Sequence, residues 1–148
     1  MRAVHDAITQ AASGERFAVG FTDLDDFKSV NDTLGHDAGD ELWRQLGARL
    51  RESVRKVDVV ARLAGDEFVL LLRELDDGEL VEALAKRTLA ALEQPFVLKG
   101  LQVRVGASLG GVLSGRDMSA QEVIATADRA MYQAKRQGKN HFFIHDCR

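Results

Sequence analysis

The chain has 148 residues, of which 45% are hydrophobic, and a formal net charge of −3. This length supports one well-buried core but not two ordinary domains, so we expect a single domain over residues 1–148. The slightly acidic charge argues against a nucleic-acid polymer as partner, because binding one needs clustered Lys and Arg to neutralise phosphates. Any nucleotide partner is expected to be small.

Cysteine content and hydropathy indicate where the chain works. Cys147 is the only cysteine, so an intrachain disulfide is impossible and a reducing cytoplasm is the simplest setting. No apolar run approaches the roughly 20 residues that cross a bilayer, so we expect no membrane contact by this domain. The helical start and the strand-like end are typical of a domain excised from a longer protein. We expect a cytoplasmic domain, or the cytoplasmic part of a membrane-anchored protein.

The first predicted elements are a strand and a helix. An apolar run at residues 17–22 predicts a buried strand that ends in the acidic segment Asp23-Leu24-Asp25-Asp26. A helix is predicted from about Gly39 to Val54, with Trp43 packed beside an apolar stripe. That stripe is formed at four-residue spacing by Leu42, Leu46 and Leu50.

A hairpin and a second helix come next. Strand-like runs at 57–63 and 67–72 predict a hairpin that turns at Ala64-Gly65-Asp66. The segment Asp76-Asp77-Gly78-Glu79 has the pattern of a capping box and predicts a helix start. Pro95 is expected to close this helix.

The last elements are a small hairpin, a strand, a helix and a terminal strand. The hairpin is predicted to turn at Lys99-Gly100 and to lead into a central strand at 103–109. Ser119 to Glu122 forms a second capping box, and Gly138 is expected to end the helix that follows. The terminal strand is predicted at 141–144.

This order of elements, β-α-β-β-α-β with an inserted hairpin, predicts an α+β fold. We expect a central, mostly antiparallel sheet with flanking helices and a small extra hairpin. In the ferredoxin-like arrangement the helices would lie on one face of the sheet.

Acidic residues lie at two predicted strand ends. If the strands ending near Asp23 and Glu67 are neighbours, two carboxylates converge and form a platform for Mg²⁺, which often takes one or two carboxylates and completes its shell with water and phosphates. Taken singly, such acids are commonly solvated loop residues. Asp25 is predicted to cap the helical turn that follows it. A calcium loop starting at Asp23 is excluded, because Lys28 and Leu34 stand where it needs Gly and Glu.

Five blocks of sequence carry a family resemblance over nearly the whole chain, and they comprise residues 23–36, 38–41, 61–68, 107–110 and 127–140. In this order they resemble the GGDEF domain of diguanylate cyclases, whose signature here reads Ala64-Gly65-Asp66-Glu67-Phe68. The resemblance implies the fold of nucleotide cyclases and polymerase palms. It also implies condensation of two GTP molecules into cyclic di-GMP, with release of pyrophosphate.

The resemblance implies a metal site at the signature. Asp23, the backbone carbonyl of Leu24 and Glu67 would hold Mg²⁺, or Mn²⁺, on the triphosphate. Asp66 would assist the metal or the deprotonation of the 3′-hydroxyl. A metal that neutralises the triphosphate and lowers the pKa of the hydroxyl supplies much of the catalysis, so a strong protein base is not required.

The resemblance also assigns substrate-binding residues. Asn31 and Asp40 match guanine-reading positions, and a carboxylate suits guanine because it accepts from both N1–H and the 2-amino group. Phosphate contacts and close backbone approach are assigned to Lys28, Lys135, Lys139 and Gly65. Taken singly, each lysine is an ordinary solvated residue.

Arg55 and Asp58 match the Arg-x-x-Asp motif that binds the product, cyclic di-GMP, as an inhibitor in this family. Arg55 can fork onto a phosphate or stack on guanine, while Asp58 can accept from a guanine edge. The alternative for this motif is an exposed ion pair at a helix end.

The sequence departs from the family at Ala64, where the family pattern has glycine. If Gly65 takes the positive φ angle, the turn tolerates Ala64; if Ala64 must be left-handed, the cost is about 1–2 kcal/mol. The methyl group could also crowd the nucleotide.

Two functions follow from these residues. The first is an active diguanylate cyclase, which must work as a homodimer because each subunit holds one GTP. The second is a non-catalytic domain that binds GTP or cyclic di-GMP and regulates a linked phosphodiesterase (EAL) domain, an arrangement that residues 94–100 resemble. A covalently linked sensor is expected as well. A purely structural dimerisation domain is the third alternative.

Overall fold

The computed structural model describes residues 2–12, 16–25, 27–62, 67–75, 78–114, 118–138 and 140–147. Its helices are α1 (Arg2–Ala12), α2 (Phe27–Leu34), α3 (His36–Ser53), α4 (Gly78–Glu93) and α5 (Ala120–Arg136). Its strands are β1 (Ala18–Leu24), β2 (Val59–Arg62), β3 (Glu67–Leu72), β4 (Phe96–Leu98), β5 (Leu101–Val103), β6 (Ala107–Leu113) and β7 (His141–Asp146).

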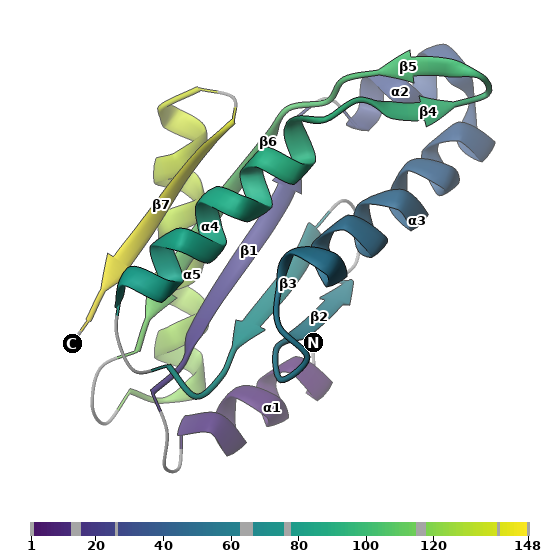
Figure 1. Cartoon of the computed structure of the whole chain (residues 1–148). Helices are drawn as coiled ribbons and strands as arrows, with labels where there is room; N and C mark the ends of the chain where they lie inside the picture. The colour runs from purple at the N-terminus through teal and green to yellow at the C-terminus, as the bar shows by residue number, and fades with distance from the viewer. Residues whose placement is uncertain are drawn as a thin grey trace.

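The described strands form one main sheet and one small hairpin. The main sheet has five strands in the order β2-β3-β1-β6-β7, and β4 pairs with β5 in the separate hairpin (Figure 1). β1 runs antiparallel to both of its neighbours, β3 and β6, whereas β6 and β7 are parallel. The predicted α+β fold with a mostly antiparallel central sheet and an extra hairpin is confirmed.

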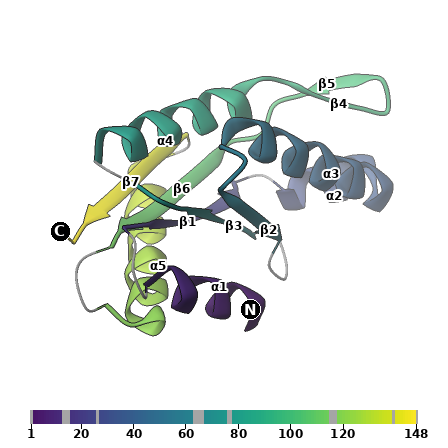
Figure 2. The same ribbon diagram turned by 60° about the horizontal axis from the view of Figure 1, so that its bottom comes forward.

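Helices cover both faces of this sheet (Figure 2), so the expectation that they lie on one face is wrong. Leu24 of β1 belongs to a core cluster with residues of α3 and α4. Val19 and Phe21 of the same strand lie in a second cluster with residues of α1 and α5. Successive side chains of a strand point to opposite faces, so a strand that is apolar on both needs cover on both.

The structure moves three predicted boundaries. The helix expected from Gly39 begins at His36, and α2 precedes it with Gly35 between them at φ 93°. Glycine adopts this angle readily, so the chain can change direction there and start a second helix. The first arm of the hairpin starts at Val59 rather than at 57. The strand expected at 103–109 is divided, because β5 ends at Val103 and β6 begins at Ala107.

The predicted ends of α5 are confirmed. The Ser119 hydroxyl accepts a hydrogen bond of 3.1 Å from the backbone N–H of Glu122 and donates one of 3.2 Å to the Glu122 carboxylate. At the other end, Gly138 has φ 109° and its N–H donates to the carbonyl of Lys135 at 3.1 Å. The cap predicted at Asp76 lies outside the described residues.

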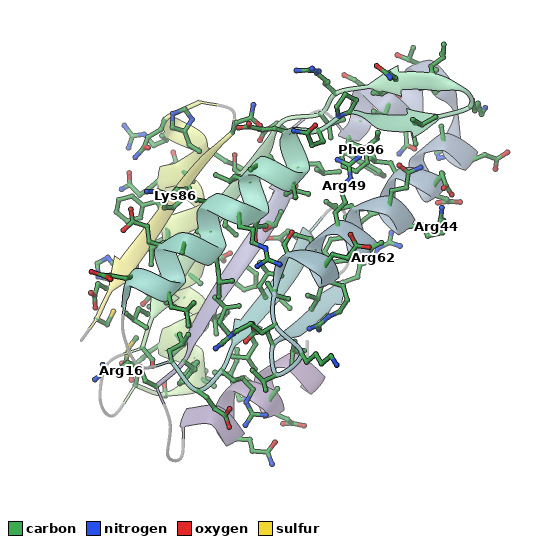
Figure 3. All side chains as sticks on the ribbon, viewed as in Figure 1. Arg16, Arg44, Arg49, Arg62, Lys86 and Phe96 are labelled. Atoms are coloured by element: carbon green, nitrogen blue, oxygen red, sulfur yellow. The ribbon has the colours of Figure 1, made fainter. Side chains whose placement is uncertain are left out.

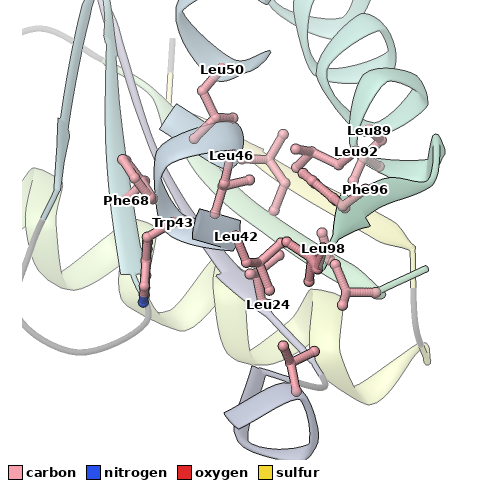
Figure 4. Close-up of a cluster of buried hydrophobic side chains, with 14 of the residues drawn as sticks. Leu24, Leu42, Trp43, Leu46, Leu50, Phe68, Leu89, Leu92, Phe96 and Leu98 are labelled. Carbon is pink, nitrogen blue, oxygen red and sulfur yellow. The ribbon is translucent and has the colours of Figure 1, made fainter. Parts of the chain in front are cut away.

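Trp43 lies in the core, as its position beside the Leu stripe predicts (Figure 4). It is 4% exposed, and its ring centroid lies 5.0 Å from that of Phe68 and 5.1 Å from that of Phe27. The Arg62 guanidinium, at the end of β2, lies 4.2 Å from the centre of the Trp43 ring. This stack joins α3 to the strand that enters the signature turn. In the part of the chain that the structure describes, no helix is long and apolar enough to span a bilayer.

Candidate functional site

The register of the sheet places two carboxylates opposite each other. Asp23 near the end of β1 pairs with Glu67 at the start of β3. Directly opposite residues in an antiparallel pair project their side chains from the same face, so both carboxylates lie on the face that α5 covers. The condition set by the sequence, that these two strands are neighbours, is therefore met.

Lys135 of α5 forms an ion pair with Asp23, its Nζ donating to Oδ2. The Asp23 side chain is 12% exposed and that of Lys135 is 44% exposed, so a cation that reaches solvent compensates an almost buried acid. Gly110 of β6 permits this contact. A Cβ at Gly110 would lie 1.9 Å from the backbone nitrogen of Met131, one helical turn before Lys135. Only a residue without a side chain lets α5 approach the sheet so closely.

Asp25 is held against β6. Its backbone N–H donates to the carbonyl of Gly106 at 2.7 Å, and its Oδ1 accepts from the Ser108 hydroxyl at 3.0 Å. Ser108 is itself the register partner of Asp23. The carboxylate of Asp25 is thus directed to β6, which differs from the predicted cap at the start of α2. Its second oxygen is buried and has no hydrogen-bond partner among the described residues.

The carboxylate oxygens at this end of the β1–β3 pair are suitable ligands for a hard divalent cation. Asp23 and Glu67 supply two carboxylates, and two are enough for Mg²⁺ when water and phosphate oxygens complete the octahedron. Within the described residues, no three His, Cys, Asp or Glu side chains gather into a fuller metal-binding group. Asp66, predicted to assist the metal, lies outside the described residues, as do Ala64, Gly65 and Lys139.

The two predicted guanine-reading residues lie on either side of the α2–α3 junction, Asn31 in α2 and Asp40 in α3. The carbonyl of Asn31 accepts from the N–H of Gly35, and the carbonyl of Gly35 accepts from the N–H of Gly39. The Asn31 amide lies directly against Gly39, the residue before Asp40. To other described residues, the side chains of Asn31 and Asp40 make no hydrogen bond, and Asp40 is exposed. Two polar side chains that are not used within the fold can bind a ligand. Lys28, predicted to contact phosphate, is exposed on α2.

The acid next to Asp40 is already paired. Arg44 donates to both carboxylate oxygens of Glu41, and Gln45 donates to one of them at 3.1 Å. The hydrogen bond from Arg44 is the main cause that lowers the pKa of Glu41 to about 2, so Glu41 is ionised and paired at neutral pH. Unlike Glu41, Asp40 has no such pairing among the described residues, so its carboxylate remains available to a base.

Two contacts near the site have no signal in the sequence. Lys99, at the tip of the β4–β5 hairpin, donates from Nζ to the carbonyl of Leu34 at 2.7 Å and so ties the hairpin to the end of α2. The side chain of Asn140, after α5, accepts from the N–H of Ala107 at 3.2 Å. Both contacts join segments far apart in the chain, and residue type alone does not predict such pairs.

Arg55 and Asp58 are bonded to each other. The Asp58 carboxylate accepts from the backbone N–H of Arg55 at 2.8 Å, from Nε at 3.0 Å and Nη2 at 2.9 Å of its guanidinium, and from the N–H of Arg73 at 3.0 Å. The Asp58 side chain is 0% exposed, and that of Arg55 is 32% exposed. The pair is therefore not an exposed ion pair at a helix end. In this conformation the four hydrogen bonds to the Asp58 carboxylate come from Arg55 and Arg73, not from a ligand.

Comparisons with known proteins agree with this arrangement. The family described as "Diguanylate cyclase, GGDEF domain" matches residues 2–141. Among solved structures, the GGDEF domain of TpbB (YfiN) from Pseudomonas aeruginosa is similar, with a TM-score of 0.92 and 34% identity over 97% of this chain and 87% of that chain. A protein of M. capsulatus described as an EAL/GGDEF domain protein has a TM-score of 0.82 and 37% identity, covering 97% and 96% of the two chains.

Curated relatives include longer proteins. The chain is 42% identical over 94% of its length to the bifunctional diguanylate cyclase/cyclic di-GMP phosphodiesterase MucR of Pseudomonas aeruginosa, and it spans only 20% of that protein. It is 40% identical to the cyclic di-GMP phosphodiesterase NbdA of the same organism, over 86% of this chain and 16% of NbdA. The matched signature, the opposed acids of β1 and β3 and the similarity to solved GGDEF domains agree over nearly the whole length, and the chain belongs to the GGDEF family of diguanylate cyclase domains.

Proposed function

We propose that this domain is a diguanylate cyclase that condenses two GTP molecules into cyclic di-GMP. The observation that carries the proposal is the pairing of Asp23 with Glu67 across β1 and β3, with Lys135 of α5 bonded to Asp23. Two acids at the ends of neighbouring strands, with a lysine from α5 beside them, form a charge pattern suited to a metal-bound triphosphate. The second support is the match of residues 2–141 to the GGDEF family.

Each residue has a distinct task in the proposed reaction. Asp23, Glu67 and the carbonyl of Leu24 hold Mg²⁺ or Mn²⁺, and Asp66 assists them. A bound metal supplies charge neutralisation of the triphosphate and a lower pKa of the 3′-hydroxyl. Lys28, Lys135 and Lys139 bind phosphates as point charges, and the backbone at Gly65 contacts the nucleotide.

Guanine is read by Asn31 and Asp40. The Asp40 carboxylate accepts from N1–H and from the 2-amino group, which adenine does not present in this arrangement. Both side chains come from the α2–α3 junction, so the base is held on the helical side of the site and the triphosphate extends toward the end of β1.

The reaction requires two subunits. In each half-reaction, the 3′-oxygen of one GTP attacks the α-phosphorus of the other, the bond from that phosphorus to the bridging oxygen breaks, and pyrophosphate leaves while the hydroxyl proton is lost. Each subunit holds one GTP, so the two nucleotides must face each other across a homodimer. A monomer binds GTP without turnover.

We further propose product feedback at Arg55. Because Asp58 is buried and accepts four hydrogen bonds from the protein, its task in this conformation is to orient the Arg55 guanidinium. Arg55 is then the residue that contacts a phosphate or base of cyclic di-GMP. Calorimetric titration with cyclic di-GMP, on the wild type and on Arg55→Ala, measures this binding directly.

Incubation of the purified domain with GTP and Mg²⁺ tests the main proposal. We expect cyclic di-GMP and pyrophosphate in a ratio of one to two, a rate that rises steeply with protein concentration, and no product with Asp23→Asn or with a chelator present. If GTP binds at high protein concentration but is not consumed, the proposed cyclase activity is ruled out.

A second candidate function is supported by the relatives. NbdA and PdeR of Escherichia coli, which is 37% identical over 96% of this chain, are both described as cyclic di-GMP phosphodiesterases. Together with Ala64 in the signature, this favours a domain that binds GTP or cyclic di-GMP and regulates a linked EAL domain. The distinguishing result is GTP that changes the activity of the full-length protein without being consumed.

A further inference from the structure

Gly39 lies inside a helix, where glycine is unfavourable. It is the fourth residue of α3, it is buried, and its φ angle is an ordinary helical one. Glycine at an interior helical position costs roughly 0.5–1 kcal/mol relative to alanine. Gly39 is therefore not explained by backbone conformation, as Gly35 is. The explanation must come from what occupies the space of its missing side chain.

The Asn31 side chain occupies that space. A Cβ at Gly39 would lie 1.9 Å from Oδ1 of Asn31, shorter than any real contact, and 3.0 Å from its Cγ, which is tighter than most. The backbones of the two helices are tied at this point through Gly35, and Val30 and Ala38, the neighbours of the two residues, belong to one core cluster. Neither α2 nor α3 can move away from the other without disturbing this core cluster.

The side chain is thus the part that moves when Gly39 gains a methyl group. Oδ1 is the far end of a short side chain that makes no hydrogen bond to other described residues, so rotation of the amide relieves the contact at small cost to the fold. The amide would then leave its place against Gly39, the residue before Asp40. A substitution at Gly39 is therefore expected to change base binding more than it changes the free energy of unfolding.

We propose that Gly39 is a positioning residue for base selection, which leaves room for the Asn31 amide at the α2–α3 junction so that Asn31 and Asp40 both reach the guanine edge bearing the 2-amino group. This inference rests on the proposed binding of GTP. The 2-amino group distinguishes guanine from hypoxanthine, the base of ITP. Gly39 therefore contributes to the preference for GTP over ITP rather than to nucleotide affinity in general.

The test compares Gly39→Ala with a matched control on the same helix. A Cβ at Gly47 would meet the Phe68 ring at 3.6 Å, an ordinary contact, so Gly47→Ala adds the same methyl group without displacing a neighbour. Affinities for the α,β-methylene analogues of GTP and ITP are measured by calorimetry, because these analogues cannot be turned over. For Gly39→Ala we expect the affinity for the GTP analogue to fall roughly tenfold, the worth of one hydrogen bond, with a change below about threefold for the ITP analogue. Gly47→Ala should leave both affinities unchanged.

A double-mutant cycle shows whether Gly39 acts through Asn31. In an Asn31→Ala background the amide is gone, so adding Gly39→Ala should not change the GTP/ITP ratio further, and this double variant carries no steric conflict that would prevent folding. An unchanged ratio in Gly39→Ala, equal losses for both analogues, or additive effects in the cycle would each overturn the inference. A wild type that binds neither analogue contradicts the proposed function itself.

Discussion

Lys135 in α5 forms an ion pair with Asp23 at the end of β1, across a separation of 112 residues in the sequence. The contact joins the last helix to the first strand of the domain. It places a cation beside an acid proposed to hold the metal, so the same lysine can serve the triphosphate when nucleotide is bound. This relationship leads to the first prediction.

Lys135→Ala is expected to lower kcat/KM for GTP by roughly 10- to 100-fold, mainly through a higher KM, because a point charge that binds phosphate is lost. The measurement is steady-state formation of cyclic di-GMP. Lys86→Ala is the control, since Lys86 (Figure 3) is an exposed lysine of α4 that pairs with Glu82 in the preceding turn of that helix. Equal kinetics in the two variants would remove the phosphate role of Lys135.

Asp58→Asn is expected to destabilise the domain by about 3 kcal/mol. The carboxylate is buried and accepts from Arg55 and Arg73, and an amide offers one acceptor atom in place of two. Urea denaturation followed by circular dichroism gives the free energy of unfolding. In the exposed pair of Glu82 with Lys86, Glu82→Gln should change it by less than about 0.5 kcal/mol. A variant at Asp58 as stable as the wild type would mean that the pair is open in solution.

Replacement of Arg49 by lysine is expected to destabilise the domain. Its guanidinium donates to the carbonyls of Ala91 and Gln94 at 2.9 and 2.6 Å and to that of Pro95 at 2.5 Å, and it lies 3.7 Å from the centre of the Phe96 ring (Figure 3). Burial lowers the pKa of Arg49, but an arginine stays charged at all ordinary pH values.

Because lysine is a point charge without a planar fork, Arg49→Lys should cost about 1 kcal/mol of unfolding free energy, and Arg49→Ala about 2 kcal/mol. Thermal and urea denaturation check both values. Arg44→Ala is the control, since Arg44 contacts an exposed acid on its own helix (Figure 3). Full stability in Arg49→Lys would show that the charge alone is needed at the end of α4.

Ala64→Gly restores the family pattern in the signature. If the methyl group forces Ala64 into a left-handed conformation in the reacting complex, the cost of about 1–2 kcal/mol corresponds to roughly 5- to 30-fold in rate. We therefore expect a higher kcat with little change in KM for GTP. An unchanged kcat would show that the turn tolerates alanine, with Gly65 taking the positive φ angle.

Much of the fold follows from local patterns. The ends of α5, the β4–β5 turn at Lys99-Gly100 and the position of Trp43 beside the Leu stripe are each predicted from residues within a few positions and are confirmed. Capping, turn chemistry and helical periodicity act over one or two turns of chain, so the sequence displays them directly. Predictions that span more than one element were less accurate. The path through Gly35 and the division of 103–109 depend on packing between elements, and both differ from the prediction.

By itself the sequence determined the family and the types of residue at the site, because the blocks from Asp23 to Lys139 keep their order and spacing. The tertiary structure decided how they meet. The register of β1 against β3 pairs Asp23 with Glu67, and the close approach of α5 at Gly110 brings Lys135 to Asp23. The tertiary structure also pairs the buried Asp58 carboxylate with the Arg55 guanidinium. These contacts join residues far apart in the chain, and their geometry is set by packing of the whole core rather than by any local preference.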